Sequence, residues 1–241
     1  MTLDPVQGHW CRRWIKAPGF EDHTTRVHWM QCGDVYSDVR IPEDRPDVGG
    51  ITCLAELGVK DLTVLAQAEG FAGRITMEGM RCTWHREINW HGTPEAEDIG
   101  DISFRDDGAM IEAGVLADYT ELWDGGPSKA MAAATLRMDD KIGFLVTIGT
   151  VFVFGIGKTG LPATAELLDR MQAEHSTDLA RPLFDGFHAF GHWDGQKGIA
   201  SLATNPFCEG GIILSQSADG FIWHQTDFDG TTCDLPLSLD P

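Results

Sequence analysis

Asp-Gly dipeptides between short alternating runs of apolar and polar residues constrain this chain most. They include Asp107-Gly108, Asp194-Gly195, Asp219-Gly220 and Asp229-Gly230. An Asp-Gly pair readily adopts the backbone of a two-residue turn, and such a turn joins neighbouring antiparallel strands. The flanking runs alternate with the two-residue period of a strand that has one buried face. The sequence therefore predicts a mainly β protein built from hairpins.

The expected elements follow the same order in both halves of the chain: three strands, one helix and about five further strands. In the first half the strands are expected at 8–15, 24–32, 35–41, 71–77, 81–90, 99–104, 110–115 and 119–123, with the helix near 61–66. In the second half they are expected at 130–137, 143–149, 150–157, 187–193, 198–204, 211–216, 221–227 and 232–237, with the helix near 163–173. A Gly-Gly-Pro-Ser segment at 125–128 separates the halves.

This number of short antiparallel strands favours closed barrels, because closure leaves no exposed sheet edge. We therefore predict two tandem lipocalin-like antiparallel β-barrels, residues 1–126 and 127–241, each with one short helix after its third strand. A single larger barrel spanning the whole chain is the alternative.

Several segments resemble known proteins. Gly8-His9-Trp10 resembles the Gly-x-Trp of the first strand of lipocalin-like (calycin) proteins. The stretches VYSDVRIPEDRP, GFAG, CTWHREINW and YTELW are similar to those of a bacterial family of uncharacterised cytosolic proteins with this barrel type. The resemblance covers about half of residues 8–123 and almost none of the C-terminal half. It implies a fold, with ligand binding as the expected role and no particular reaction.

Charge and composition exclude some classes of partner. The formal net charge is −19, from 18 Lys and Arg against 37 Asp and Glu, which disfavours nucleic acid and anionic membranes as partners. The amino terminus has no basic segment followed by an apolar one, so we expect no secretory signal and a cytoplasmic protein. The six cysteines form no Cys-x-x-Cys pair. We expect them to be free, mostly buried thiols, with no structural zinc held through cysteine.

Two strands carry the candidate site residues. In 35–41, Tyr36, Asp38 and Arg40 share one face, and the other face is mostly apolar. If the apolar face packs inside, the three polar residues form the wet exterior. If they point into the barrel, Arg40 pairs with Asp38 and offers a fixed fork of donors to an anionic group, and Tyr36 supplies a hydroxyl.

Two orientations are also possible for the segment 82–91, since either of its faces could point into the barrel. Strict alternation places Trp84, Arg86, Ile88 and Trp90 on one face and His85, Glu87, Asn89 and His91 on the other. With the aromatic face inside, Arg86 stacks between indoles and the His/Glu row is solvated. With the His/Glu row inside, His85 and Glu87 could transfer protons or contribute ligands for zinc or iron.

Other histidines give little information. His188 and His192 share a strand face but lie about 13 Å apart at ~3.3 Å per residue, too far to bind one ion side by side. Gly155-Ile156-Gly157-Lys158-Thr159 lacks the first glycine of a P-loop, and no Gly-x-Ser-x-Gly or His-Glu-x-x-His occurs.

The sequence thus predicts a non-enzymatic binder of a small apolar or aromatic ligand, as a monomer or homodimer, and names no cofactor. The residues expected to hold the ligand in a barrel cavity are Tyr36, Asp38, Arg40, Trp84, His85, Arg86, Glu87 and Trp90. Two alternatives are an enzyme or a metal- or haem-binding protein using His85 and Glu87, and a protein-interaction scaffold.

Overall fold

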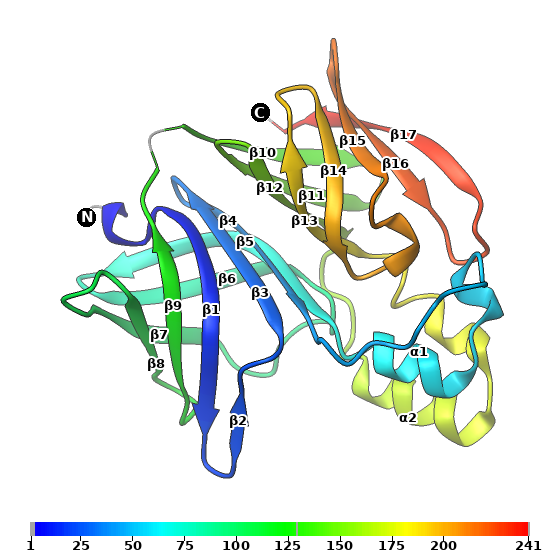
Figure 1. The fold of residues 1–241 in the computed structure, drawn as a ribbon, viewed down its shortest axis with the longest axis horizontal. Helices are drawn as coiled ribbons and strands as arrows, with labels where there is room; N and C mark the ends of the chain where they lie inside the picture. The colour runs from blue at the N-terminus through cyan, green and yellow to red at the C-terminus, as the bar shows by residue number, and fades with distance from the viewer. Residues whose placement is uncertain (1–2, 129, 241) are drawn as a thin grey trace.

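Residues 3–128 and 130–240 are described by the structure, a computed structural model, and they form two β-barrels side by side (Figure 1). Residues 1–2, 129 and 241, which belong to the predicted ranges 1–126 and 127–241, lie outside the described residues. No helix in the described part of the chain is long and apolar enough to span a membrane.

The N-terminal barrel closes through hydrogen bonding between its first and last strands. The strands run in the order β1-β3-β4-β5-β6-β7-β8-β9, every neighbouring pair is antiparallel, and β9 pairs back onto β1. The short β2 pairs only with the end of β1 and lies outside the closed ring. The bounds are β1 Gly8–Ala17, β2 Phe20–Asp22, β3 Arg26–Cys32, β4 Val35–Ile41, β5 Glu69–Glu78, β6 Arg81–Asn89, β7 Asp98–Phe104, β8 Met110–Gly114 and β9 Thr120–Gly126.

The C-terminal barrel is an eight-stranded meander that closes through pairing of β10 with β17. Its strands are β10 Met131–Met138, β11 Lys141–Ile148, β12 Val151–Lys158, β13 Phe187–Trp193, β14 Lys197–Ala203, β15 Ile212–Ser217, β16 Gly220–Thr226 and β17 Thr232–Leu239. The two closures confirm the prediction of two tandem antiparallel barrels, and the alternative of one larger barrel is wrong.

Each barrel has one helix after its third barrel strand, as predicted. Helix α1 (Val59–Leu65) follows β4, and α2 (Ala165–Glu174) follows β12. The two helices lie together beside the C-terminal barrel (Figure 1). They share a buried apolar cluster that includes Leu62, Leu65, Trp90, Met171 and Phe184.

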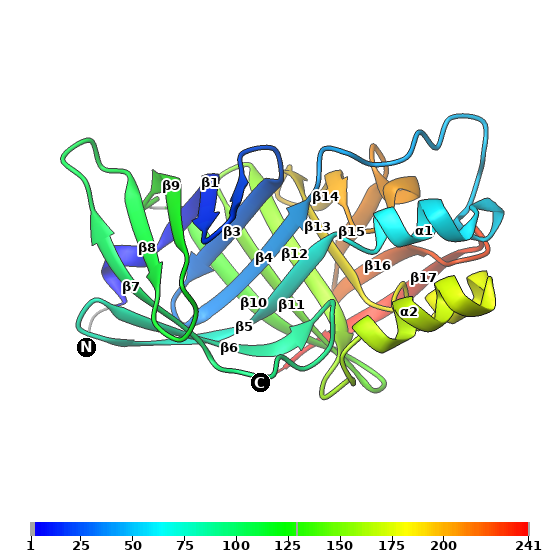
Figure 2. The ribbon, with the colours of Figure 1, turned by 90° about the horizontal axis from the view of Figure 1, so that it is seen from below.

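The two barrels pack against each other through the outer faces of facing strands. Strands β3 to β6 contact β10 to β14, which cross behind β4 and β5 in Figure 2. An apolar cluster fills the seam between them, with Val39, Ile41, Phe144, Val146 and Val153 among its fully buried members. Strand β4 is therefore buried on both faces, one towards its own barrel and one towards the other barrel.

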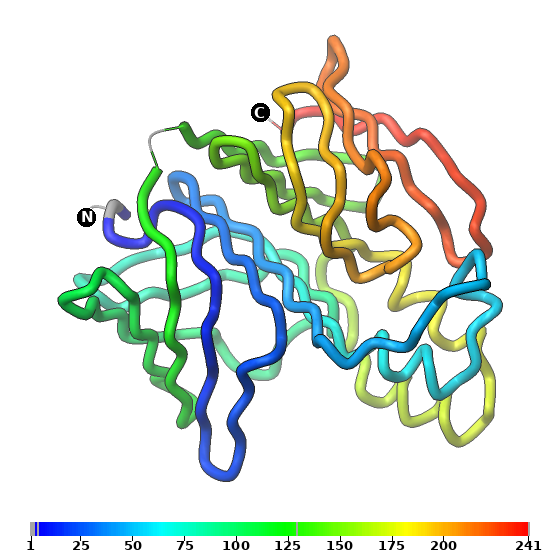
Figure 3. Tube along the Cα trace, in the orientation of Figure 1, coloured from blue at the N-terminus to red at the C-terminus, as the bar shows by residue number. Residues whose placement is uncertain are grey.

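The segment between β4 and α1 also ties the halves together, since it leaves the N-terminal barrel and runs along the C-terminal one (Figure 3). Arg45 donates to both carboxylate oxygens of Glu209, at 2.8 and 3.0 Å, and to the carbonyl of Ala203 at 3.1 Å. The backbone N–H of Ala55 donates to the carbonyl of Phe228 at 2.9 Å.

Candidate functional site

Tyr36, Asp38 and Arg40 point into the N-terminal barrel, where Asp38 and Arg40 join a buried network of charges, while the Tyr36 hydroxyl has no partner among the described residues. Arg40 donates to Asp38 at 2.9 Å and lies 3.5 Å from Glu121. Glu121 also accepts from Arg12 at 2.7 Å. Burial raises the pKa of Asp38 to about 6, even though the Arg40 guanidinium acts in the opposite direction.

A second part of this network lies across the same interior. Arg86 donates to Asp98 at 2.6 and 3.0 Å, and its guanidinium lies 3.6 Å from the centre of the Phe71 ring. The hydroxyl of Tyr119 donates to Glu112 at 2.8 Å. Burial and the neighbouring Glu121 carboxylate raise the pKa of Glu112 well above its usual range.

These side chains leave little free space inside the N-terminal barrel. A cavity of about 10 Å³ remains between Trp29, Asp38, Arg40, Phe71, Trp84, Asp98, Glu112 and Trp123. Such a volume holds about one water molecule. The predicted roomy ligand cavity is therefore replaced by a packed polar core, because the arginine and tryptophan side chains fill the space between the strands.

A β-bulge in β6 overturns the strict alternation expected for residues 82–91. Ala72 of β5 pairs with Ile88 and the next residue, Gly73, pairs with Arg86, so Glu87 is the extra residue. Trp84 therefore packs inside the N-terminal barrel, whereas Ile88 faces the C-terminal barrel. Trp90 also lies outside, where its ring meets that of Phe184 edge-on at 5.3 Å.

His85 and Glu87 lie on the outside of the barrel. His85 is exposed and shares a hydrogen bond of 3.0 Å with Thr76, and Glu87 lies 3.6 Å from Arg74. Because His85 pairs with the outward Arg74, it cannot line the interior, and the proposed acid–base or metal-ligating pair has no cavity to act on. Neither residue belongs to the candidate site.

The interior of the C-terminal barrel is packed with apolar side chains. Phe152, Phe154, Phe187 and Trp223 are buried there. The ring centres of Phe154, Phe187 and Trp223 lie 5.9 to 6.4 Å from one another. A pocket of useful size is found elsewhere, between the barrels.

That space is a pocket of about 290 Å³ at the seam, bounded on one side by the loop before α2. It lies at the small end of the range for ligand sites. Most of its walls are apolar, and its lining consists of Ile88, Asn89, Trp90, Ile156, Gly157, Lys158, Leu161, Pro162, Ala163, Thr164, Leu167, Pro182, Leu183, Gly186 and His188.

The loop before α2 is fixed to the N-terminal barrel by hydrogen bonds across the seam. The backbone N–H of Thr164 donates to the carbonyl of His91 at 3.0 Å, and that of Thr93 donates to the carbonyl of Leu161 at 2.8 Å. The pocket is therefore formed by both halves of the chain and does not belong to either barrel alone.

His188 is the more deeply buried of the two buried polar residues in the pocket wall, the other being Thr164. It lies on β13, is 2% exposed, and its Nδ1 has no hydrogen-bond partner among the described residues. Burial lowers the pKa of His188 to about 3, so the imidazole is neutral at pH 7. A neutral imidazole has one donor and one acceptor nitrogen, and either can bind a polar group of a ligand.

Glycines make room for this imidazole. A Cβ atom at Gly70 would lie 2.2 Å from His188 Cγ, and one at Gly155 would lie 2.6 Å from His188 Nδ1. The indole nitrogen of Trp90, also on the pocket wall, has no hydrogen-bond partner in the described part of the chain. Two buried side chains with polar ring nitrogens thus belong to the wall of this mostly apolar pocket.

Of the residues predicted to hold a ligand, only Trp90 lines this pocket. Sequence reasoning missed His188 as a site residue, because its role depends on how the two barrels dock and not on any local motif. The nearest signal is the pair of glycines at 70 and 155, which are distant in sequence and meet only at the seam.

Comparisons with known proteins support the fold. No protein-family model matches the sequence, and no curated protein matches it. The structure is similar to a crystal structure of an uncharacterized protein from Saccharomyces cerevisiae, with a TM-score of 0.57 and 11% identity over 97% of this chain and 98% of that one. At this identity the similarity shows a shared arrangement of both barrels and nothing about activity.

Proposed function

We propose that the protein binds a small, mostly apolar or aromatic molecule in the pocket between its barrels, without catalysing a reaction on it. The observation that carries the proposal is His188, a neutral imidazole buried in the wall of a mostly apolar pocket. A ligand with a polar group that hydrogen-bonds to the imidazole gains an interaction that the apolar side chains of the wall do not offer.

The barrels themselves serve as rigid supports in this proposal, of the lipocalin-like type that the first strand resembles. The ligand lies between them and not within one, because both interiors are packed. An aromatic ring with one hydroxyl group matches the pocket's size and chemistry, since the ring contacts the apolar wall and the hydroxyl donates to the imidazole.

A binding experiment with 2-naphthol and naphthalene tests this proposal. Isothermal titration should show that 2-naphthol binds with one site per chain and more tightly than naphthalene, because only the former reaches a hydrogen-bond partner. Ala163→Trp places a large side chain at the exposed rim of the pocket, and we expect it to weaken 2-naphthol binding by about tenfold or more, roughly 1.4 kcal/mol.

The matched control is Ala173→Trp, an exposed position on α2 that does not line the pocket. It should bind 2-naphthol as the parent protein does. Equal affinity of both variants for 2-naphthol, or no binding by the parent protein, would contradict the proposal.

A further inference from the structure

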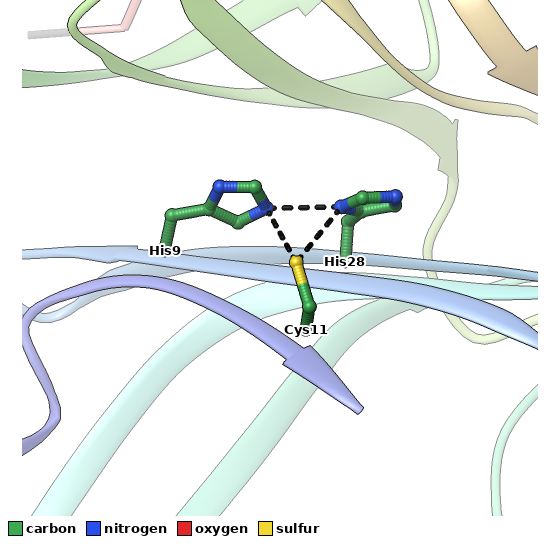
Figure 4. Close-up of side chains that lie close together, drawn as sticks. All are labelled: His9, Cys11 and His28. Carbon is green, nitrogen blue, oxygen red and sulfur yellow. Dashed lines mark hydrogen bonds between the residues drawn. The ribbon is translucent and has the colours of Figure 1, made fainter. Parts of the chain in front are cut away.

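Three metal-ligating side chains meet on the outer surface of the N-terminal barrel. His9 and Cys11 are two residues apart on β1 and therefore share a face, and His28 on β3 is the direct cross-strand partner of Cys11. Figure 4 shows the two imidazole rings and the thiol directed towards one another. The strands themselves set this convergence, so no loop has to move to create it.

The distances between the ligand atoms suit one metal ion. His9 Nε2 lies 2.9 Å from His28 Nδ1, and Cys11 Sγ lies 3.5 Å from each of these nitrogens. Tetrahedral zinc with Zn–N near 2.0 Å and Zn–S near 2.3 Å needs separations of about 3.3 Å between nitrogens and about 3.5 Å between nitrogen and sulfur. The imidazoles would have to separate by only a few tenths of an ångström.

The surroundings keep the imidazoles in the form that binds metals. All three residues are half-buried. Burial lowers the pKa of His9 below its usual value and that of His28 to about 3, so both rings are neutral at pH 7. Burial, and then the nearby Asp124 carboxylate, raise the pKa of Cys11, so the thiol is protonated without a metal and has to release its proton when one binds.

An aromatic ring of the C-terminal barrel packs against both imidazoles. The ring of Phe190 on β13 is parallel to that of His28, with their centres 3.7 Å apart and 1° between their planes, and it also stacks on His9 at 5.4 Å. Such packing fixes the orientation of the imidazole rings, which is the task of the outer layer of a metal site. The cluster therefore lies at the seam of the two barrels, and none of its three residues lines the pocket that contains His188.

We propose that His9, Cys11 and His28 bind one zinc ion, with the fourth coordination position open to water or to an exogenous ligand. Two imidazoles and one thiolate suit a borderline transition ion and not Mg²⁺ or Ca²⁺, which prefer oxygen ligands. Three protein ligands with one open position are typical of sites at which zinc activates a bound molecule, whereas structural zinc is usually enclosed by four. This proposal is independent of ligand binding in the pocket.

Metal titration of the full chain tests the site. After removal of metals with a chelator, isothermal titration with Zn²⁺ should give one site per chain with a Kd below about 1 μM. Co²⁺ should give the charge-transfer absorption of a cobalt–thiolate bond together with the visible bands of a four-coordinate ion. Cys11→Ser should remove the charge-transfer band and weaken Zn²⁺ binding by about 100-fold, and His28→Gln should weaken it similarly.

Matched controls separate this site from adventitious binding. Cys32→Ser changes another half-buried thiol, near the end of β3, and His192→Gln changes an exposed histidine of the other barrel. Both should bind Zn²⁺ as the parent chain does. Circular dichroism of each variant verifies folding, and imidazole NMR signals of the unmodified protein should shift for His9 and His28 on Zn²⁺ addition. Absence of submicromolar Zn²⁺ binding, or binding that survives both Cys11→Ser and His28→Gln, would overturn the proposal.

Discussion

Asp38 shows the energetic cost of burying a carboxylate inside the N-terminal barrel. Its side chain is 2% exposed and carries one direct ion pair, with Arg40 at 2.9 Å, while Glu121 places a second negative charge nearby. Desolvation outweighs the attraction of Arg40, and the pKa of Asp38 rises from 3.8 to about 6. Between these two values the folded protein retains a proton that the unfolded chain has already released.

The sign of the resulting pH dependence follows from this difference. Because the folded state binds more protons between pH 3.8 and about 6, the contribution of Asp38 to the unfolding free energy falls as the pH rises through this window. The total change corresponds to roughly 3 kcal/mol. Asp38→Asn should remove it, so the difference in unfolding free energy between parent and variant should change by roughly 2.4 kcal/mol between pH 4 and pH 7, the remainder falling below pH 4.

Urea denaturation at a series of pH values measures this difference. Other titrating groups contribute to both proteins and cancel in the comparison. Parallel stability curves for parent and Asp38→Asn across pH 4 to 7 would show that Asp38 keeps its ordinary pKa in the folded state.

At the scale of single elements, β4 and β6 show what sequence reasoning can and cannot supply. Alternation correctly grouped Tyr36, Asp38 and Arg40 on one face, because β4 has no irregularity. It could not tell which face is inside, since both faces of β4 are buried. In β6 the bulge at Glu87 reverses the facing of every later residue, and nothing in the sequence of β6 itself marks it.

The same reasoning explains why both candidate sites were missed. The Cys11–His28 pairing depends on cross-strand register across the short β2 hairpin, and alternation within one strand does not fix that register. The pocket around His188 depends on the docking of two barrels. Turn dipeptides and alternation, in contrast, are local properties, and they were sufficient to predict the strand order, the two closures and the places of both helices.

Gly73 is the residue on β5 that accommodates the bulge. Its φ is +159°, and a Cβ atom there would lie 2.1 Å from the carbonyl oxygen of His85 and 2.8 Å from the backbone nitrogen of Glu87. Since both contacts are with backbone, they cannot be relieved by a side-chain rotation. Gly73→Ala should therefore destabilise the protein by about 2–4 kcal/mol in urea denaturation.

Gly58→Ala is the control for this substitution. Gly58 has a φ of −76°, lies at the N-cap of α1 and has no atom within 4 Å of the Cβ position, so the change should cost no more than about 1 kcal/mol, the usual effect of Ala at an N-cap. Similar effects of the two substitutions would mean that the bulge is not held by close backbone contact.

The molecule consists of two closed barrels, and buried clusters shared by both halves pack them into one unit. Each barrel uses its own interior core, yet a third core lies between them and a fourth joins the two helices. Separating the barrels would expose Val39, Ile41, Phe144 and Val153, all fully buried at the seam. Burial of this kind contributes about 1.5–3 kcal/mol for each large side chain. The predicted ranges 1–126 and 127–241 are therefore expected to depend on each other for stability.

Phe144 allows this dependence to be measured. It lies on β11 of the C-terminal barrel, is fully buried at the seam, and points away from its own barrel interior. Phe144→Ala should cost about 3–5 kcal/mol. If the barrels unfold together, native-state hydrogen exchange should show the same loss of protection in β8 of one barrel and β16 of the other, neither of which belongs to the facing strands. Ile199→Ala, at a position that is 38% exposed, should leave both strands almost unaffected. Loss of protection confined to β16 would mean that the N-terminal barrel is stable alone, and the seam would then join two independent domains.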